Sequence, residues 1–300
     1  MITGLTTMTN ILVTGVNGQL GSEIRCLIDH QPSAIDHQRF YFTDRDALDI
    51  TNKKAIDQFV QNNAIEIIIN AAAYTAVDKA EEDENSANKV NYLATRHLAE
   101  VAKEHGVKLI YISTDYVFDG KNHTPYNEDD KTNPNSIYGK TKLLGEEAMK
   151  EINPKDSIII RSSWIYSSFG TNFATTMLRL GKERDELGVI FDQVGTPTYA
   201  RDLAKAILEI LPNIHNDTVE IYHYSNEGVS SWYDFAKEIM RMAKIECKVN
   251  PIETKEYPTP ATRPHYSVLN KSKIKKKFGI TIPYWKESLD NCLKVLGEKK

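Results

Sequence analysis

Three residues of this chain have types and spacing suited to the reduction of a carbonyl group. Tyr138 and Lys142 are four residues apart, so on a helix they share one face. An ammonium beside a phenol favours the phenolate, so Lys142 is expected to lower the pKa of Tyr138 from its usual value of about 10. Such a phenol is a proton donor of usable strength. The third residue is Thr114, which lies before Tyr138 in the sequence, at the end of an expected strand, and carries a hydroxyl group.

A second pair with the same spacing, Tyr233 and Lys237, lies in the segment W-Y-D-F-A-K. The apolar residues at 232, 235, 236, 239 and 240 around it follow helical spacing and are typical of an ordinary packing face. Sequence context therefore favours the pair at Tyr138, which follows a nucleotide-binding pattern.

That pattern begins with a short apolar strand, residues 11–14, followed directly by G-V-N-G-Q-L-G from Gly15. The glycines permit a tight turn and close backbone approach, and the helix that follows would point its N-terminus at a pyrophosphate. The spacing differs from G-x-G-x-x-G, so a glycine-rich turn without a ligand is the alternative. The cofactor-binding residues expected here are Gly15, Asn17, Gly18, Gln19, Leu20 and Gly21.

The cofactor is expected to be NADPH or NADH. The second expected strand, residues 40–42, leads to Asp44, which could accept hydrogen bonds from a ribose 2′-hydroxyl, and to Arg45, which could hold a 2′-phosphate. The chain offers both, so these residues do not choose between the two nucleotides. The third expected strand, residues 65–70, is followed by side chains small enough to let a cofactor lie across them: Ala71, Ala72 and Ala73.

Strands alternate with helices in this part of the chain, including an expected helix at 87–105 and a strand at 108–113. Such alternation predicts an α/β fold with a Rossmann-type doubly wound parallel sheet, whose ligands bind at the carboxyl ends of the strands. The alternation is regular only before Trp164. We therefore expect a nucleotide-binding domain at 8–163, to which 198–220 returns, and a smaller substrate-binding α/β region at 164–197 and 221–300.

Bulk properties exclude several classes of function. The net charge of −4 gives no electrostatic reason to expect nucleic-acid or anionic-membrane binding. No apolar run approaches 18 residues, the length of a membrane span. Residues 1–10 lack the pattern of a signal peptide, and Met8 is an alternative start that would leave 1–7 as an extension. Three scattered cysteines suit a reducing compartment, so a cytoplasmic location is expected. No metal is expected, since histidines and cysteines show no ligand spacing.

Blocks of sequence along nearly the whole chain carry a resemblance to a known family. They are G-V-N-G-Q-L-G from Gly15, N-A-A-A-Y-T-A-V-D-K-A-E from Asn70, S-T-D-Y-V-F-D-G from Ser113, Y-G-K-T-K-L-L-G-E from Tyr138, R-S-S-W-I-Y from Arg161, N-F-A-T-T-M-L-R-L from Asn172, D-Q-V-G-T-P-T from Asp192 and Y-P-T-P-A-T-R-P from Tyr257. With them the chain resembles the extended short-chain dehydrogenase/reductases and, among these, the dTDP-4-dehydrorhamnose reductases. The last four blocks are the most specific, because they lie in the half that selects substrate.

The resemblance implies that the C4 keto group of dTDP-4-dehydro-L-rhamnose is reduced with NAD(P)H to give dTDP-L-rhamnose for cell-surface polysaccharide synthesis. It implies a catalytic trio of Thr114, Tyr138 and Lys142, of which the last two also bind the cofactor. Asp49 and Ile50 would lie near the adenine. The substrate-binding residues that it implies are Thr114, Asp115, Tyr116, Trp164 and Arg263.

Some members of that family carry magnesium between acidic side chains at a dimer interface, and a homodimer is possible here. Glu23 could be one such ligand, but Arg201 stands where another acid would be wanted. Two alternatives stay open at this stage. One is a reductase or epimerase of another nucleotide-activated deoxysugar. The other is a non-catalytic regulatory subunit of methionine adenosyltransferase, which shares the fold and much of the S-x-D-Y-V-F-D-G pattern.

Overall fold

The computed structural model of the chain describes residues 8–30 and 37–298; residues 1–7, the possible extension, lie outside the described part. Its centre is a six-stranded sheet with the order β10-β5-β4-β3-β1-β2, in which every neighbouring pair is parallel. The strands of this sheet are β1 (Thr9–Thr14), β2 (Gln38–Thr43), β3 (Ile67–Asn70), β4 (Lys108–Thr114), β5 (Ile158–Ser162) and β10 (Glu220–Tyr224).

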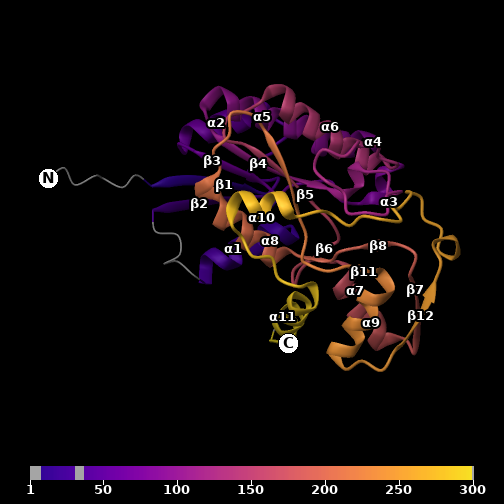
Figure 1. The fold of residues 1–300 in the computed structure, drawn as a ribbon. Coiled ribbons are helices and arrows are strands. Elements are labelled where there is room, and N and C mark those ends of the chain that lie inside the picture. Colours follow the sequence, from indigo (N-terminus) through magenta and orange to yellow (C-terminus); the bar gives the residue numbers. More distant parts are fainter. Residues whose placement is uncertain (1–7, 31–36, 299–300) are drawn as a thin grey trace.

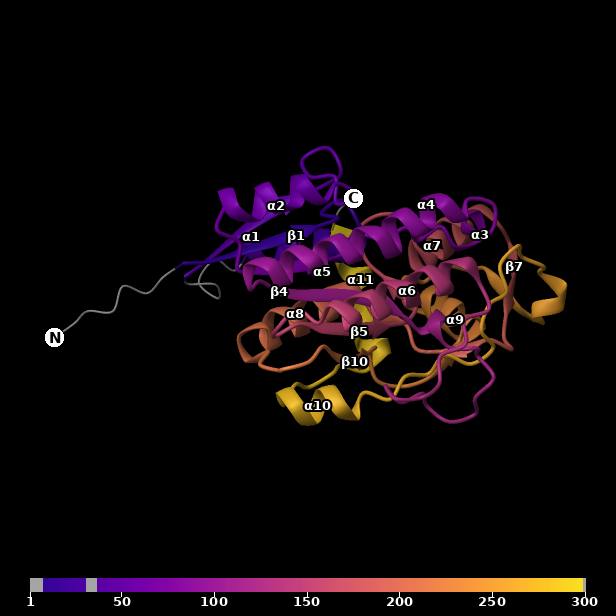
Figure 2. The same ribbon diagram turned by 90° about the horizontal axis from the view of Figure 1, so that it is seen from above.

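Helices cover both faces of this sheet, as Figures 1 and 2 show. On one face lie α2 (Lys53–Asn62), α5 (Ala94–His105) and α6 (Ile137–Ile152). On the other face lie α1 (Gln19–His30), α8 (Ala200–Ile210) and α10 (Ser272–Phe278). Successive residues of a strand point to opposite faces, so Ile11 and Val13 join the core with α1 and α8, while Leu12 joins the core with α2 and α5. Both faces of the sheet are therefore buried, as parallel sheets require.

The rest of the chain builds a smaller body around a third apolar core, which contains Phe235 and Trp285. It lies beyond the carboxyl ends of β3, β4 and β5 in Figure 1. Its helices are α7 (Phe173–Glu183), α9 (Trp232–Ala243) and α11 (Trp285–Glu298). Its short paired strands are β6 (Ile165–Tyr166) with β9 (Thr198–Tyr199), β7 (Glu186–Ile190) with β12 (Lys248–Ile252), and β8 (Val194–Gly195) with β11 (Ser230–Ser231). The Tyr233 pair lies on α9, where Tyr233 packs against this core as the sequence predicted.

The expected doubly wound sheet is confirmed, and two details differ from the sequence prediction. The helix expected at 87–105 begins earlier, as α4 (Glu84–Asn88), and passes through a π-helical turn (Lys89–Leu93) before α5. The segment expected to return to the sheet ended at residue 220, but β10 continues it to Tyr224. The division of the chain into two regions stays a prediction. The remaining short helices are α3 (Val77–Ala80), Asp115–Val117, Leu211–Asn213 and Thr254–Glu256. In the described part of the chain, no helix is long and apolar enough to cross a membrane.

Candidate active site

The glycine turn after β1 packs directly against the end of β3. Gly15 has a φ of +70°, and a Cβ added there would lie 2.7 Å from the backbone N and Cα of Ala72. A Cβ added at Gly21 would lie 2.4 Å from the Gly15 carbonyl oxygen. Glycine is therefore required at both positions, at the first by conformation and close approach, and at the second by the packing of α1 on the turn.

A cleft of about 730 Å³ opens over this turn, along the carboxyl ends of β1, β2 and β3. Most of the residues expected to bind the cofactor line it: Gly15, Asn17, Gly18, Asp44, Arg45, Asp49, Ile50, Ala71, Ala72 and Ala73. Five expected residues are not among its lining residues: Tyr138 and Lys142, which lie on α6, and three residues of the glycine motif. Gln19 donates from Nε2 to the Ile165 carbonyl at 3.4 Å, Leu20 is buried in the core below, and Gly21 serves the packing just described.

At one end of the cleft, Asp44 is held by its own loop. Its Oδ1 accepts from the backbone nitrogens of Ala47 (3.0 Å) and Asp46 (3.1 Å), and its Oδ2 accepts from Asn17 Nδ2 (3.1 Å). These hydrogen bonds, chiefly that from Ala47, hold the pKa of Asp44 below its usual value, so the carboxylate stays charged. Arg45 lines the same cleft. The carboxylate of Asp44 and the guanidinium of Arg45 thus line the same cleft.

Asp49 is fixed by Thr51 through two hydrogen bonds to Oδ1, from the backbone N (2.9 Å) and from Oγ1 (2.7 Å). Both bonds lower its pKa, and Arg45 and Lys89 add a smaller effect of the same sign. Lys89 and Lys79 also line the cleft, which sequence reasoning had not predicted. The cleft therefore holds cations from three segments of the chain as well as carboxylates.

The expected catalytic trio comes together where β4 ends. Thr114 is the last residue of β4, and its Oγ1 donates to Asp115 Oδ1 at 3.0 Å. Tyr138 lies in the first turn of α6, whose start is capped by the Ser136 side chain. The Tyr116 ring meets the Tyr138 ring edge to face at 5.5 Å. Thr114 acts to lower the pKa of the Tyr138 phenol, which indicates that its hydroxyl faces the phenol.

The expected pKa pattern of the tyrosine–lysine pair is wrong for this structure. Burial raises the pKa of Tyr138 to about 12, against the smaller effect of Thr114. Burial also lowers the pKa of Lys142 to about 7. The Lys142 Nζ donates to the Ile112 carbonyl at 2.6 Å and lies 4.1 Å from the centre of the Tyr111 ring. Desolvation is the largest cause of both shifts, because burial disfavours the charged form of each group.

Asp115 contributes a buried carboxyl group beside this trio. Burial raises its pKa to about 7, while the neighbouring hydroxyls of Thr114 and Ser267 act in the opposite direction. Ser267 comes from a segment more than a hundred residues away, and sequence reasoning gave it no role. A group with such a pKa changes its charge near neutral pH, next to the hydroxyl of Thr114.

Segments from the second half of the chain close over this point. The Gly120 carbonyl accepts from Tyr266 N at 3.1 Å, and a Cβ at Gly120 would lie 2.4 Å from the Pro264 side chain. Val194 N donates to the His265 carbonyl at 2.7 Å. The D-Q-V-G-T-P-T block and the Y-P-T-P-A-T-R-P block are therefore joined to the loop that follows Thr114.

Trp164 lies between β5 and β6 in the left-handed region, with a φ of +49°. Its indole stacks on Trp232 at a centroid distance of 3.5 Å. A Cβ at Gly195 would lie 2.7 Å from the same indole and 3.0 Å from Ser267 Oγ. A bulky residue held with positive φ at a candidate site indicates strain that the surrounding packing maintains.

Arg263 is held at the same mouth by an acid that sequence reasoning did not single out. One guanidinium nitrogen lies 2.6 Å from Asp78 Oδ2, and another donates to the Ala261 carbonyl at 3.2 Å. Although burial opposes it, hydrogen bonding from Arg263 lowers the pKa of Asp78. Arg263 also lowers the pKa of Tyr116, against the larger effect of burial. The arginine thus lies near the tyrosines of the site.

The π-helical turn supplies another residue that sequence reasoning missed. Asn91 accepts from Tyr74 N (2.9 Å), donates to Tyr74 O (3.1 Å), and donates to Thr141 Oγ1 (3.1 Å). It therefore ties the wall of the cleft to the turn of α6 between Tyr138 and Lys142. π-helical turns are frequent at functional sites, but their position has no simple sequence signal.

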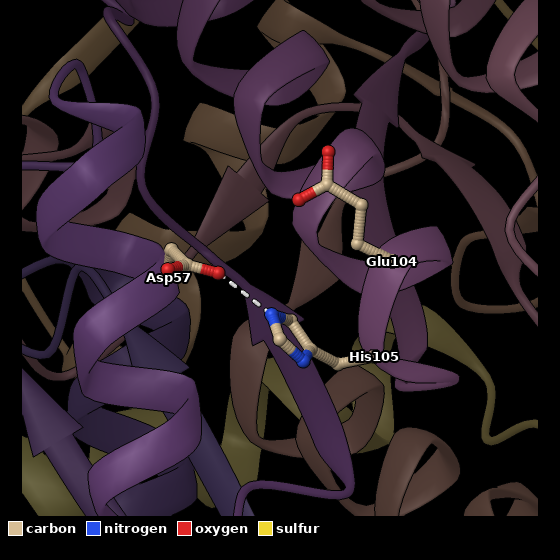
Figure 3. Close-up of side chains that lie close together, drawn as sticks. All are labelled: Asp57, Glu104 and His105. Carbon is tan, nitrogen blue, oxygen red and sulfur yellow. Dashed lines mark hydrogen bonds and ion pairs between the residues drawn. The ribbon is translucent and has the colours of Figure 1, made fainter.

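Two groups of side chains bear on metal binding. Glu23 is fully buried, and Arg201 Nε lies 3.0 Å from its Oε2 while Ser167 Oγ donates to its Oε1 at 2.6 Å. An arginine therefore compensates this carboxylate. The second group, Asp57, Glu104 and His105 on α2 and α5, offers ligand atoms within 4.8 Å of one another (Figure 3).

The second group is already occupied by hydrogen bonds. His105 Nε2 lies 2.6 Å from Asp57 Oδ1, and a dashed line marks this contact in Figure 3. Lys53 Nζ lies 2.8 Å from Glu104 Oε1. An ammonium on one of the three ligands opposes a second cation at the same place. We therefore assign no metal to this surface cluster.

Comparison with known proteins agrees with this geometry. A family model described as "RmlD substrate binding domain" matches residues 8–297. The dTDP-4-dehydrorhamnose reductase of Aggregatibacter actinomycetemcomitans is 42% identical over 295 residues, which is 95% of this chain and 98% of the relative. The chain belongs to the dTDP-4-dehydrorhamnose reductase family. The relatives named in this subsection are reductases, so the comparisons do not favour a regulatory subunit of methionine adenosyltransferase.

Solved structures of this family share the fold along nearly the whole chain. A dTDP-4-dehydrorhamnose reductase from Clostridium acetobutylicum has a TM-score of 0.90 at 43% identity and covers 96% of this chain and 100% of its own. The Bacillus anthracis reductase, solved in complex with NADP, has a TM-score of 0.89 at 38% identity, with coverage of 96% and 100%.

Proposed function

We propose that this protein reduces the C4 keto group of dTDP-4-dehydro-L-rhamnose with NADPH or NADH to give dTDP-L-rhamnose, for cell-surface polysaccharide synthesis. One observation carries the proposal: Thr114 ends β4 and acts on the Tyr138 phenol of α6, while Lys142, one turn further along α6, is buried with its Nζ on the Ile112 carbonyl of the same strand. Membership of the reductase family supplies the substrate class. The same arrangement suits carbonyl reduction, because two donors converge where an oxyanion would form.

The cleft beside the trio fits a dinucleotide. The Gly15 turn leaves no room for a side chain against Ala72, and α1 points its N-terminus at the turn, as pyrophosphate binding requires. Asp44 suits a ribose hydroxyl and Arg45 suits a 2′-phosphate, so both nucleotides are expected to bind. When bound, the nicotinamide supplies the hydride that reduces the carbonyl carbon.

The residues of the chain handle the oxygen. Tyr138 donates its phenolic proton to the carbonyl oxygen as negative charge develops there, and it regains a proton from solvent afterwards. With substrate bound, Thr114 turns its single hydroxyl proton from Asp115 Oδ1 to the same oxygen, which stabilises the transition state more than the ground state. Lys142 uses one N–H on the Ile112 carbonyl, leaving two for the nicotinamide ribose. Its charge stabilises the Tyr138 phenolate.

Substrate recognition is assigned to residues around the mouth of the site. Trp164 presents an indole held between Gly195 and Trp232, which suits the apolar face of a deoxysugar. Asp115 and Tyr116 flank the reacting carbonyl. Arg263 suits a diphosphate, because a guanidinium matches phosphate geometry and binds it by two parallel hydrogen bonds.

A turnover assay tests the proposed function. The full-length protein is mixed with dTDP-4-dehydro-L-rhamnose and either NADPH or NADH, and oxidation of the nicotinamide is followed together with the formation of dTDP-L-rhamnose. The same assay with other nucleotide-activated 4-keto deoxysugars tests the remaining alternative. Faster turnover of one of those sugars would replace the proposed substrate, and no turnover of any would remove the reductase function.

Three further expectations stay predictions: the division into nucleotide-binding and substrate-binding regions, the homodimer and the cytoplasmic location. Size-exclusion chromatography with light scattering distinguishes a 34.0 kDa monomer from a dimer.

A further inference from the structure

One turn beyond Lys142 on α6, a buried carboxylate joins the elements that carry the catalytic trio. Glu146 is fully buried, and its Oε1 accepts from Ser113 Oγ on β4 at 2.5 Å. Arg161 on β5 binds it with both sides of the guanidinium, from Nε to Oε1 at 2.9 Å and from NH2 to Oε2 at 2.7 Å. Three neighbouring elements thus meet at one carboxylate.

The position of Ser113 makes this contact relevant to chemistry. Ser113 lies between Ile112, whose carbonyl holds the Lys142 Nζ at 2.6 Å, and Thr114, the last residue of β4. The same helix, α6, carries Tyr138, Lys142 and Glu146 at intervals of four residues, so all three lie along one face. The carboxylate therefore fixes the end of β4 against the face of α6 that carries the tyrosine and the lysine.

The charges around Lys142 point to a second effect. Tyr138 and Glu146 face it along α6, the Tyr111 ring faces it from β4, and Arg161 faces Glu146 from β5. Glu146 favours the protonated form of Lys142 and opposes the larger effect of burial. Among these groups it is the carboxylate on the lysine's own helix face.

We propose that Glu146 is a positioning residue for the reduction: with Ser113 and Arg161 it clamps β4 to α6, and its negative charge, one turn along the helix, favours the ammonium form of Lys142. The proposal rests on the proposed function, since it assigns Glu146 a role in that reaction. Neither the glycine motif nor the Tyr-x-x-x-Lys pattern includes this residue.

The test compares Glu146→Gln with Glu147→Gln, an exposed neighbour on the same helix. The turnover number is measured against pH with dTDP-4-dehydro-L-rhamnose and NADPH. Loss of the carboxylate lowers the lysine pKa further, so the ammonium disappears at lower pH. For Glu146→Gln we expect the alkaline limb to move down by at least about one pH unit, which corresponds to a tenfold change in protonation. The sugar KM should change less than threefold, and Glu147→Gln should match the wild type.

Folding and position are controlled separately. Glu146→Gln leaves Arg161 buried without a counter-charge, so the double variant Glu146→Gln/Arg161→Met removes both charges together. Circular dichroism identifies which of them folds. If a folded variant keeps the wild-type limb, or loses turnover equally at every pH, the role assigned to Glu146 is wrong.

Failure of the clamp can be told from failure of the proposed function. If the wild type does not turn over the sugar, the function fails, and the clamp is then read from NADPH affinity against pH. Lys142 is assigned to the nicotinamide ribose, so NADPH affinity should fall as the pH rises and Lys142 loses its proton. In Glu146→Gln this fall should begin at a lower pH than in the wild type. Coincident affinity curves would overturn the clamp, whatever the substrate is.

Discussion

Replacing Lys142 by methionine should stabilise the protein and abolish its activity. Burial lowers the pKa of this lysine from the usual 10.5 to about 7, and methionine fills a similar volume without a charge. At about 1.4 kcal/mol per pKa unit, burying the ammonium costs about 5 kcal/mol of folding free energy below pH 6. The variant also leaves the Ile112 carbonyl without its donor, a loss of about 1–3 kcal/mol. We expect a net gain of about 2 kcal/mol or more.

The buried lysine also determines whether the stability of the wild type rises or falls with pH. Between pH 7 and 10.5 the unfolded chain holds the lysine proton and the folded protein does not, so wild-type stability rises with pH across this window. The penalty is therefore largest below pH 7 and falls to under about 1 kcal/mol at pH 10.5. The stability difference between variant and wild type should narrow in the same way.

Urea unfolding at pH 6, 8 and 10 measures this difference from midpoints at equal slopes. Lys140→Met, at an exposed position two residues earlier on α6, is the matched control and should stay within about 0.5 kcal/mol of the wild type at each pH. A Lys142→Met variant no more stable than the wild type at pH 6, or a difference that does not narrow by pH 10, would refute the reasoning.

Three further outcomes are expected. Tyr138→Phe should lower turnover by about 10²–10⁴ while NADPH affinity stays within a few fold, as titration calorimetry can check; wild-type turnover would make the phenol structural. Steady-state kinetics should show less than about tenfold preference between NADH and NADPH, because Asp44 and Arg45 act in opposite directions on a 2′-phosphate; a hundredfold preference would mean that only one of them faces the ribose. Arg263→Ala should raise the sugar-nucleotide KM about 10- to 150-fold and leave the nicotinamide KM unchanged. The control variant Asp78→Asn should not raise the sugar-nucleotide KM. Equal effects of Arg263→Ala on both KM values would indicate unfolding.

Local pattern was enough to predict much of the sheet. The alternation of apolar strands and helices places β1 to β4 correctly, because each is a short apolar run separated from the next strand by helical segments. β10 could not be placed in this way, since the chain leaves the sheet after β5 and builds α7 and α8 before it returns. Its pairing with β5 depends on contacts between distant segments, which single-sequence periodicity does not contain.

The candidate site shows the same limit in its electrostatics. The spacing of Tyr138 and Lys142 correctly indicates that they lie one turn apart on the same helix, but the direction of their pKa shifts depends on depth of burial. Partners supplied by distant segments, such as Asp78 for Arg263 and Ser267 for Asp115, leave no local signal. Sequence predicts which groups meet at the end of β4, and tertiary packing decides their charge.

The pairing of β10 with β5 has a consequence for how the chain folds during synthesis. β5 lies between β4 and β10, so until residues 220–224 leave the ribosome it presents an unpaired edge of backbone N–H and C=O groups. Its sequence, I-I-I-R-S, is buried and strongly apolar, which makes such an edge prone to pair with other chains. A nascent or truncated chain ending near residue 163 would therefore expose an aggregation-prone strand, and chaperone binding should be strongest in that interval of translation.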